Sequence, residues 1–221
     1  MVDFSSSEGK LLFSEALSQG HMETYFKLAG QYFAQSDVSF CGVAVLCMVL
    51  NSLGIDPNRI WKSPWRWFSE EMMACCTPIE EIRKNGIDFD QFCVLATCKG
   101  ATVQPYRHEE SSVEKFREDI KRVTASSVDI LVVNYNRKHV GQTGTGHFAP
   151  IAGYHEASDK VLLLDVARFK YPPHWVPIPL LYGAFKDLDV MSSKTRGYIV
   201  VSSNPHYEST TDPLNCMPTQ K

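Results

Sequence analysis

One segment of this sequence is so apolar that it must lie in the interior of any fold the chain adopts. Residues 41–53 are almost all hydrophobic, and Gly54 follows as a natural end for a helix. A helix of this composition has no polar face to turn towards water, so other elements must pack around it. We therefore expect residues 41–53 to form a buried helix at the centre of the hydrophobic core.

The pattern along the chain changes from helical to stranded. Serines at positions 5–7 precede a helical pattern that Gly20 can end. Later, short β-rich runs are bounded by turn residues, at 129–135, 147–154, 160–166 and 197–202. This order predicts an α+β fold, with an N-terminal helical half packed on a C-terminal antiparallel sheet. We expect one domain over residues 1–204 and a flexible tail over 205–221, where the sequence turns polar and aperiodic.

Composition argues against several classes of partner. The net charge of −3 gives no electrostatic reason to expect nucleic acid or an anionic membrane surface. No apolar run approaches the ~20 residues that a membrane span needs, and the N-terminus shows no signal-peptide pattern. The seven cysteines are odd in number and include the adjacent Cys75 and Cys76, which fits reduced thiols better than a disulfide framework. We therefore expect a cytoplasmic protein.

Four residues along the chain suggest catalysis by a thiol. They occur in the order Gln35, Cys41, His147 and Asp165, which resembles the order of parts in papain-like enzymes. Cys41 stands where a loop becomes the buried helix. A helix N-terminus and a neighbouring imidazole can lower a thiol pKa from ~8.5 to about 3.5–7.5, which produces the nucleophilic thiolate. The pattern predicts acyl transfer through a thioester.

The predicted strands explain how the remaining groups could meet Cys41. His147 begins one strand and Asp165 ends the next, in a hairpin that turns near residues 156–159. Antiparallel neighbours could place the two side chains together, so that the carboxylate orients the ring. Gln35 could donate its amide to the developing oxyanion beside the N–H of Cys41, and one such donor is typically worth roughly 10²–10³ in rate. Gly146 would let the backbone approach a substrate closely.

Other readings of these residues stay open. A cysteine on an apolar helix is often plain core, and we expect this for Cys47. Asp165 could be a turn residue and His147 a structural strand histidine. The remaining cysteines could bind soft metal ions, with Cys75, Cys76 and Cys98 as candidates, although no zinc-finger spacing is present. The tryptophans at 61, 65 and 67 are expected to pack rather than to bind a ligand.

Three longer motifs point to a known family. They are Lys62-x-Pro64-Trp65-Arg66-Trp67-Phe68, residues 142–148 (QTGTGHF) and residues 164–177 (LDVARFKYPPHWVP). Together they resemble the catalytic domain of phytochelatin synthase of the eukaryotic type, and the similarity runs from about residue 3 to about residue 203. Cys93 is displaced by one position from a cysteine of the family pattern. Family members of this type usually continue into a cysteine-rich C-terminal domain, and whether this protein has one stays open.

The resemblance implies a fold, a reaction and a set of partners. The fold would be papain-like, and the activity a γ-glutamylcysteine dipeptidyl transfer. Cys41 would attack the Cys–Gly amide of glutathione, glycine would leave, and a second glutathione or a growing phytochelatin would take the acyl group. Cadmium, zinc or copper ions would act as activators or as part of a metal–glutathione substrate. No organic cofactor is expected, and a homodimer is a family expectation.

The resemblance also implies substrate-binding residues. Asp189 and Arg196 match positions that hold the γ-glutamyl group, whose free amine and free carboxylate suit an acid and an arginine held together. Arg168 and Tyr171 lie in the segment that the family links to a second acylation or acceptor site. Asn134, ahead of the His147 strand, is a separate candidate contact to the bound dipeptide, at a position that the family pattern does not clearly share.

Two other functions remain possible on the sequence alone. A papain-like hydrolase that removes glycine from glutathione or its conjugates would use the same catalytic residues and pass the acyl group to water. A metal-buffering or metal-sensing protein would use the cysteines as ligands and would need no catalysis. Longer peptide products would separate the transferase from the hydrolase, and the fate of turnover in Cys41→Ser would separate both from metal buffering.

Overall fold

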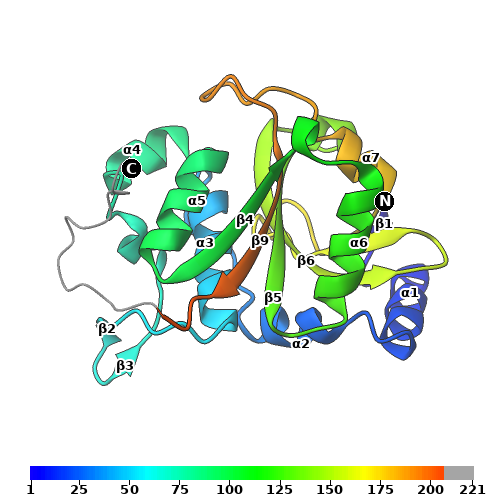
Figure 1. Cartoon of the computed structure of the whole chain (residues 1–221), viewed down its shortest axis with the longest axis horizontal. Helices are drawn as coiled ribbons and strands as arrows, with labels where there is room; N and C mark the ends of the chain where they lie inside the picture. Colours follow the sequence, from blue (N-terminus) through cyan, green and yellow to red (C-terminus); the bar gives the residue numbers. More distant parts are fainter. Residues whose placement is uncertain (207–221) are drawn as a thin grey trace.

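A seven-stranded antiparallel sheet runs through the molecule. The computed structural model describes residues 1–206. In spatial order the strands are β1 (Val2–Asp3), β8 (His174–Pro177), β7 (Lys160–Leu163), β6 (Gly146–His155), β5 (Asp129–Asn136), β9 (Gly197–Ser203) and β4 (Ala101–Arg107). The predicted β-rich runs correspond to β5, β6, β7 and β9, while β4 and β8 were not predicted. The last strand thus lies inside the sheet, between β5 and β4 (Figure 1).

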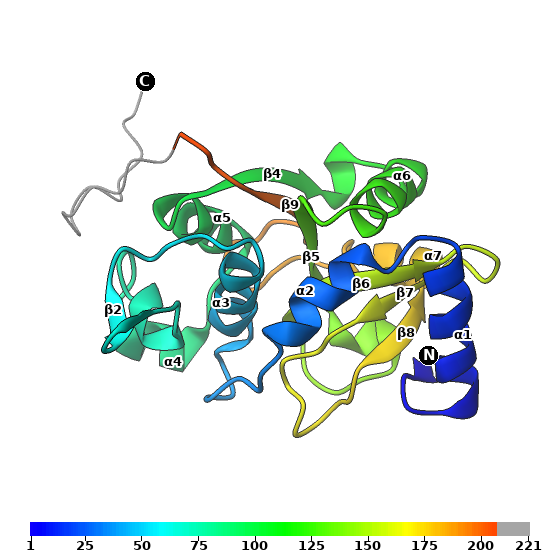
Figure 2. The same cartoon turned by 90° about the horizontal axis from the view of Figure 1, so that it is seen from below.

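Helices cover both faces of this sheet. One side carries α1 (Ser7–Ser18), α2 (Glu23–Gly30), α3 (Cys41–Ser52), α4 (Ile79–Asn85) and α5 (Phe89–Cys98). The other side carries α6 (Val113–Thr124) and α7 (Ile178–Gly183), and Figure 2 shows α6 across the sheet from α3 and α5. Three short 3₁₀ turns complete the described chain, at Glu70–Met73, His108–Glu110 and Arg137–Val140. The predicted α+β architecture is confirmed, and the helices pack on both faces of the sheet rather than on one.

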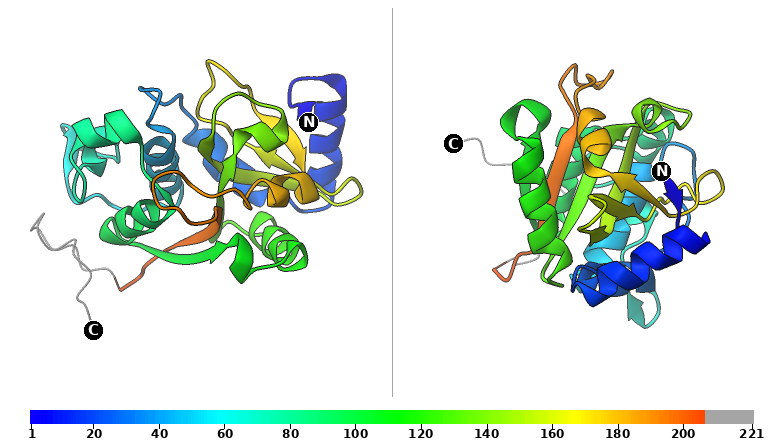
Figure 3. Two further views of the ribbon diagram at one scale, coloured as in Figure 1. Left: turned by 90° about the horizontal axis from the view of Figure 1, so that it is seen from above. Right: turned by 90° about the vertical axis from the view of Figure 1, so that its right-hand side faces the viewer.

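The alternation of side chains along the strands builds a separate apolar core on each face. In β5, Ile130 and Val132 pack towards α3, while Leu131 and Val133 pack towards α6. The same period of two runs through β9, where Ile199 faces α3. Strands buried on both faces read as continuous apolar runs, which is why they were recognisable in the sequence. Strand β1, at the N-terminus marked in Figure 3, lies at the opposite edge of the sheet from β4.

The central helix is as deeply buried as its composition predicts. Every residue of α3 from Gly42 to Leu50 is buried, and Cys47 is fully inaccessible, as expected for a core thiol. Gly42 allows the helix start to approach β6. A Cβ atom there would lie 2.4 Å from Cγ1 of Ile87 and 3.2 Å from Cδ2 of Phe148. The glycine after Cys41 therefore brings the thiol close to the strand that carries His147.

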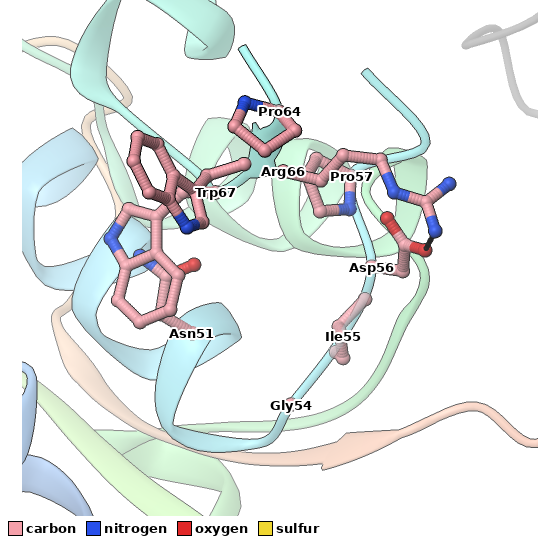
Figure 4. A pocket seen from close by; sticks show the side chains of 9 residues that line it. Asn51, Gly54, Ile55, Asp56, Pro57, Pro64, Arg66 and Trp67 are labelled. Atoms are coloured by element: carbon pink, nitrogen blue, oxygen red, sulfur yellow. Dashed lines mark ion pairs between the residues drawn. The ribbon is translucent and has the colours of Figure 1, made fainter. Parts of the chain in front are cut away.

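The tryptophan-rich segment differs from its prediction. Instead of packing inside, it forms a small hairpin of β2 (Ile60–Lys62) and β3 (Trp65–Arg66), and Trp61, Trp65 and Trp67 are 42%, 66% and 42% exposed. A two-stranded hairpin without a covering layer cannot bury large side chains on both faces. Trp67 and the Arg66–Asp56 ion pair line an open pocket of 390 Å³ (Figure 4). This pocket lies at Asn51, the opposite end of α3 from Cys41.

Two further expectations concern the ends of the chain and membranes. None of the helices in residues 1–206 is long and apolar enough to span a bilayer. The predicted tail, 205–221, falls almost wholly outside the described residues, so its flexibility stays a prediction. Residues 1–204 contain the whole sheet and both helical layers.

Candidate active site

Cys41 is the first residue of α3, at the junction between the helical layer and the sheet. Its side chain is partly exposed, whereas the helix behind it is buried. No side chain caps the N-terminus of α3, so the first-turn N–H groups are directed outwards without a capping acceptor. The His147 imidazole and the backbone N–H of Phe148 lie near the sulfur, and both lower the pKa of the thiol. The thiol therefore has both environments that favour a thiolate.

His147 is oriented by a buried carboxylate. Its Nε2 lies 2.8 Å from Oδ1 of Asp165, and Asp165 is fully buried. The carboxylate can only accept, so Nε2 carries the proton and Nδ1 is the nitrogen left to face Cys41. The β6–β7 hairpin makes this contact, because Leu164 follows β7 and donates to the carbonyl oxygen of Pro150 in β6. Asp165 ends up beside the start of β6, as the strand order predicts.

The charges of the three groups support one another. Burial would raise the pKa of the Cys41 thiol, but His147 and the Phe148 N–H outweigh burial and lower it. Burial would likewise lower the pKa of His147, yet Asp165 and Cys41 raise it. The pKa of Asp165 is held well below its usual range, against burial, by His147 and Arg137. The site therefore favours a thiolate–imidazolium pair beside an ionised carboxylate.

Gln35 lies near these groups, but its amide is already engaged. Its backbone N–H donates to the carbonyl oxygen of Val166, directly after Asp165. Its side-chain Nε2 donates to the carbonyl oxygens of Asp37 at 2.7 Å and Val38 at 2.9 Å. The predicted oxyanion role would require the amide to exchange these bonds, and it stays a prediction.

Three of the predicted substrate residues come together beside His147. Arg196 Nη2 donates to Oδ2 of Asp189 at 3.1 Å, and Nη1 donates to the carbonyl oxygens of Asp187 and Leu188. A Cβ atom on Gly146 would lie 3.2 Å from Arg196 Nη2 and 3.4 Å from Asp189 Oδ2. The absence of a side chain at this exposed glycine thus lets the strand pass close to the buried arginine. The Arg196–Asp189 pair therefore lies against Gly146, the residue before His147.

The other predicted binding residues flank Asp165. Arg168 is exposed, and its guanidinium carbon lies 4.6 Å from the ring centre of Tyr32. Tyr171 accepts a 2.7 Å hydrogen bond from the backbone N–H of Thr143. Asn134 is 2% exposed, and its Nδ2 lies 3.4 Å from the carbonyl oxygen of His147. Asn134 is thus bonded to the protein within the sheet, and its contact with a dipeptide stays a prediction.

The candidate metal cysteines meet at the surface end of α5. Cys76 Sγ lies 3.3 Å from Cys75 Sγ and 3.5 Å from Cys98 Sγ. Within residues 1–206, however, no group of three or more His, Cys, Asp or Glu residues is arranged to hold a metal ion. Cys93 is partly buried, and burial raises the pKa of its thiol to about 12. A metal-binding role for these thiols stays a prediction.

One charged residue of the site was not predicted. Arg137 is only 5% exposed, and its Nη2 donates to Oδ1 of Asp165 at 2.9 Å. In the sequence, Arg137 looks like one basic residue of a polar turn after β5. No neighbouring residue indicates that it pairs with Asp165, 28 residues away. An arginine directly after a buried strand is the signal that was available.

The fold and the site together define a class of protein. A buried helix that begins at Cys41 and packs on an antiparallel sheet carrying His147 is the papain-like architecture. A sequence model of the phytochelatin synthase family matches residues 1–198, and the chain belongs to that family.

Relatives of this chain are close but considerably longer. Glutathione gamma-glutamylcysteinyltransferase 1 of Arabidopsis thaliana is 48% identical over 207 residues, covering 94% of this chain and 42% of that protein. The glutathione gamma-glutamylcysteinyltransferase of Schizosaccharomyces pombe is 42% identical over 198 residues, covering 90% of this chain and 48% of that protein. The chain therefore spans less than half the length of these relatives.

A solved structure to which this chain is similar is a double glycine motif protease from an AMS/PCAT transporter, in complex with the leader peptide. It has a TM-score of 0.47 and 16% sequence identity to this chain, covering 78% of this chain and 90% of that one.

Proposed function

We propose that this chain is an acyltransferase that makes phytochelatins, (γ-Glu-Cys)n-Gly, from glutathione through a thioester on Cys41. The observation that carries the proposal is the contact of the Cys41 thiol with the His147–Asp165 pair at the start of a buried helix. Membership of the phytochelatin synthase family and the names of the relatives support glutathione as the substrate.

The first half-reaction would release glycine. The Cys41 thiolate attacks the carbonyl carbon of the Cys–Gly amide, and the oxyanion forms near the N–H of Cys41 at the uncapped helix start. When the C–N bond breaks, the imidazolium of His147 gives its proton to the leaving amine. The γ-Glu-Cys acyl group remains on the sulfur as a thioester.

The second half-reaction would extend the peptide. The α-amine of a second glutathione, or of a growing phytochelatin, attacks the thioester, and neutral His147 takes a proton from that amine. The new amide forms, and the Cys41 thiolate leaves. Water in place of the amine would make the same site a hydrolase, so the acceptor-binding residues Arg168 and Tyr171 decide between the two outcomes.

The proposed donor site is the pair of Arg196 and Asp189. An arginine can bind the free α-carboxylate of the γ-glutamyl group, and a carboxylate can bind its α-ammonium group. Burial lowers the pKa of Arg196 but Asp189 opposes this, and an arginine stays charged in proteins. Gly146 lets the strand that carries His147 lie directly against this pair, which supports binding of the donor next to His147.

Metal ions enter this proposal as part of the substrate. A cadmium, zinc or copper ion bound to the glutathione thiol would present a metal–glutathione thiolate to the acceptor side, and activation by these ions would follow. We also propose a cytoplasmic location, where glutathione thiols are kept reduced. A homodimer remains a prediction.

The test is mass spectrometry of the protein after brief incubation with glutathione and cadmium. The variants are wild type, Cys41→Ser and, as a matched control, Cys47→Ala, which changes a buried thiol two turns along the same helix. We expect a γ-Glu-Cys adduct on wild type and Cys47→Ala, none on Cys41→Ser, and peptides longer than glutathione in solution. An adduct with only free γ-Glu-Cys would favour the hydrolase. No adduct and no glycine release, in folded protein that binds cadmium, would favour metal buffering.

A further inference from the structure

A buried arginine shares the carboxylate that orients His147. Arg137 begins the 3₁₀ turn after β5, and its guanidinium lies inside the protein beside the fully buried Asp165. Its Nη2 donates to Asp165 Oδ1 at 2.9 Å and stands 2.8 Å from Oδ2, although only the first contact has hydrogen-bond geometry. Asp165 Oδ1 thus accepts from both His147 and Arg137, and also from the N–H of Ala167 at 2.9 Å.

The guanidinium is itself held by a chain of hydrogen bonds. Arg137 Nη1 donates to Oε1 of Gln142, and Gln142 Nε2 lies 3.2 Å from Nε2 of His174. His174 Nδ1 lies 2.8 Å from the carbonyl oxygen of Pro172. That oxygen can only accept, so His174 carries its proton on Nδ1 and accepts from Gln142 on Nε2. The direction of every bond in the chain is therefore defined, and its three side chains are all buried.

We propose that Arg137 is a positioning residue of this site: its guanidinium, fixed by Gln142 and His174, holds the Asp165 carboxylate against His147. This inference concerns the site of the proposed function and depends on that function only for the identity of the reaction. Arg137 does not touch the reacting atoms, because His147 lies between Asp165 and the Cys41 thiol.

Arg137 is expected to matter because a buried carboxylate is costly without a charged partner. If the guanidinium is removed, Asp165 must stay charged with too few donors, take up a proton, or turn to another donor. A rotated carboxyl group no longer accepts from His147 Nε2, so the ring loses its orientation. A protonated one can still accept but has lost the negative charge that stabilises the imidazolium. The positive charge of Arg137 also favours the thiolate form of Cys41, so its loss raises the pKa of that thiol.

The same guanidinium reaches the candidate acceptor side. Its carbon lies 4.8 Å from the ring centre of Tyr171, and Pro172, which ends the hydrogen-bond chain, is the next residue. Arg137 thus stands between the catalytic carboxylate and the loop that carries Tyr171. A change at Arg137 is expected to disturb acceptor binding as well as the thiolate.

The experiment measures alkylation of Cys41 by iodoacetamide as a function of pH, read by mass spectrometry of the Cys41 peptide. The variants are Arg137→Gln, which removes the charge, and Arg137→Lys, which keeps the charge but loses the planar guanidinium fork that spans Asp165 and Gln142. Arg117→Gln is the matched control, because Arg117 makes an equally short ion pair with Asp159 away from the site. Thermal unfolding and glycine release are measured on the same samples.

We expect Arg137→Gln to shift the alkylation midpoint to higher pH and to slow glycine release by about 10–100-fold, the usual effect of losing an outer partner of an orienting group. Arg137→Lys should recover most of the midpoint, and Arg117→Gln should match wild type. A folded Arg137→Gln whose alkylation profile matches wild type would overturn the proposal.

A second variant covers the case in which Arg137→Gln does not fold. Gln142→Met keeps every charge and removes both the acceptor of Arg137 Nη1 and the donor to His174 Nε2. It should slow alkylation at pH values where the wild-type thiol is ionised, and an unchanged rate would overturn the proposal. If the alkylation profiles shift but the wild-type protein makes no peptides longer than glutathione, the positioning role stands and the transferase proposal fails. If the wild-type protein makes such peptides and the alkylation profiles do not shift, only the positioning role of Arg137 fails.

Discussion

The hydroxyl group of Tyr32 donates a 2.6 Å hydrogen bond to the main-chain oxygen of Asp165. The ring of the same tyrosine faces the guanidinium of Arg168 at 4.6 Å. Burial, opposed by Arg168, raises the pKa of Tyr32, so its hydroxyl keeps its proton and remains a donor. Tyr32 therefore links the backbone of the candidate catalytic carboxylate to the candidate acceptor arginine.

This link predicts a selective effect of Tyr32→Leu on the acceptor. A cation–ring contact at an exposed site is worth roughly 0.5–1 kcal/mol, so the KM for the acceptor glutathione should rise about 2–5-fold. Tyr32→Phe keeps the ring and serves as the control. The measurement is the ratio of longer peptides to free γ-Glu-Cys over a range of glutathione concentrations. An unchanged ratio in Tyr32→Leu would show that Arg168 does not need this ring.

The shifted pKa values predict a bell-shaped pH dependence of glycine release. The pKa of Cys41 lies below its usual 9.0, so the thiolate forms as the pH rises through that lowered value. The pKa of His147 lies above its usual 6.5, so the imidazolium is lost only when the pH rises through that raised value. Acyl transfer from glutathione needs both, and activity should be highest between the two apparent pKa values of the pair.

Alkylation separates the two arms of this profile. Iodoacetamide needs only the thiolate, so its reaction with Cys41 should rise along the acid arm and show no fall on the alkaline side. Cys47 is a control within the same molecule, because burial raises the pKa of its thiol well above 9.0. If Cys41 alkylation rose only near pH 9, the proposed thiolate–imidazolium pair would be wrong.

If Gln35 binds the oxyanion, replacing its side chain should strongly lower the rate of glycine release. Gln35→Ala should lower the rate of glycine release at saturating glutathione by roughly 10²–10³, with a smaller effect on KM. Gln31→Ala, at the end of α2, is the control. A loss below threefold in folded Gln35→Ala would assign the amide to holding the carbonyl oxygens of Asp37 and Val38 instead.

Two glycines predict opposite effects on stability. A Cβ atom on Gly197 would lie 2.0 Å from the backbone oxygen of Tyr106, so Gly197→Ala must push β9 away from β4. We expect a loss of at least about 1–3 kcal/mol in the free energy of unfolding. Gly183→Ala, in α7, meets nothing within 4 Å and should be neutral or stabilising by roughly 0.5–1 kcal/mol. Urea unfolding of both variants gives the comparison, and equal midpoints would contradict it.

The parts that were predictable are those in which local pattern and burial agree. Residues 41–53 are apolar throughout, and they form the buried helix α3. The strands β5, β6 and β9 are buried on both faces, so their runs of apolar residues stand out. Once these elements are known, the meeting of His147 with Asp165 follows from the hairpin after β6.

The parts that were missed depend on contacts between distant residues. Arg137 has a role only because the fold brings Asp165 to it, and no local pattern contains that pairing. Strand β4 is defined by its register with β9, since its own side chains are largely exposed or half-buried. Helix α5 did carry a signal that was overlooked, because Asp88 and Gln91 form a reciprocal capping box at its start.

The position of β9 inside the sheet has a consequence for how the protein is made. Strand β4 has no place on the sheet until residues 197–203 have been synthesised, because β9 is its neighbour. Arg196, directly before β9, arrives in the same step. A nascent chain stalled before Arg196 would already hold Cys41, His147 and Asp165, but it would lack both the strand that closes the sheet and the arginine proposed to bind the donor. The growing polypeptide should therefore gain its completed sheet and its proposed donor-binding site together, only after that last strand has left the ribosome.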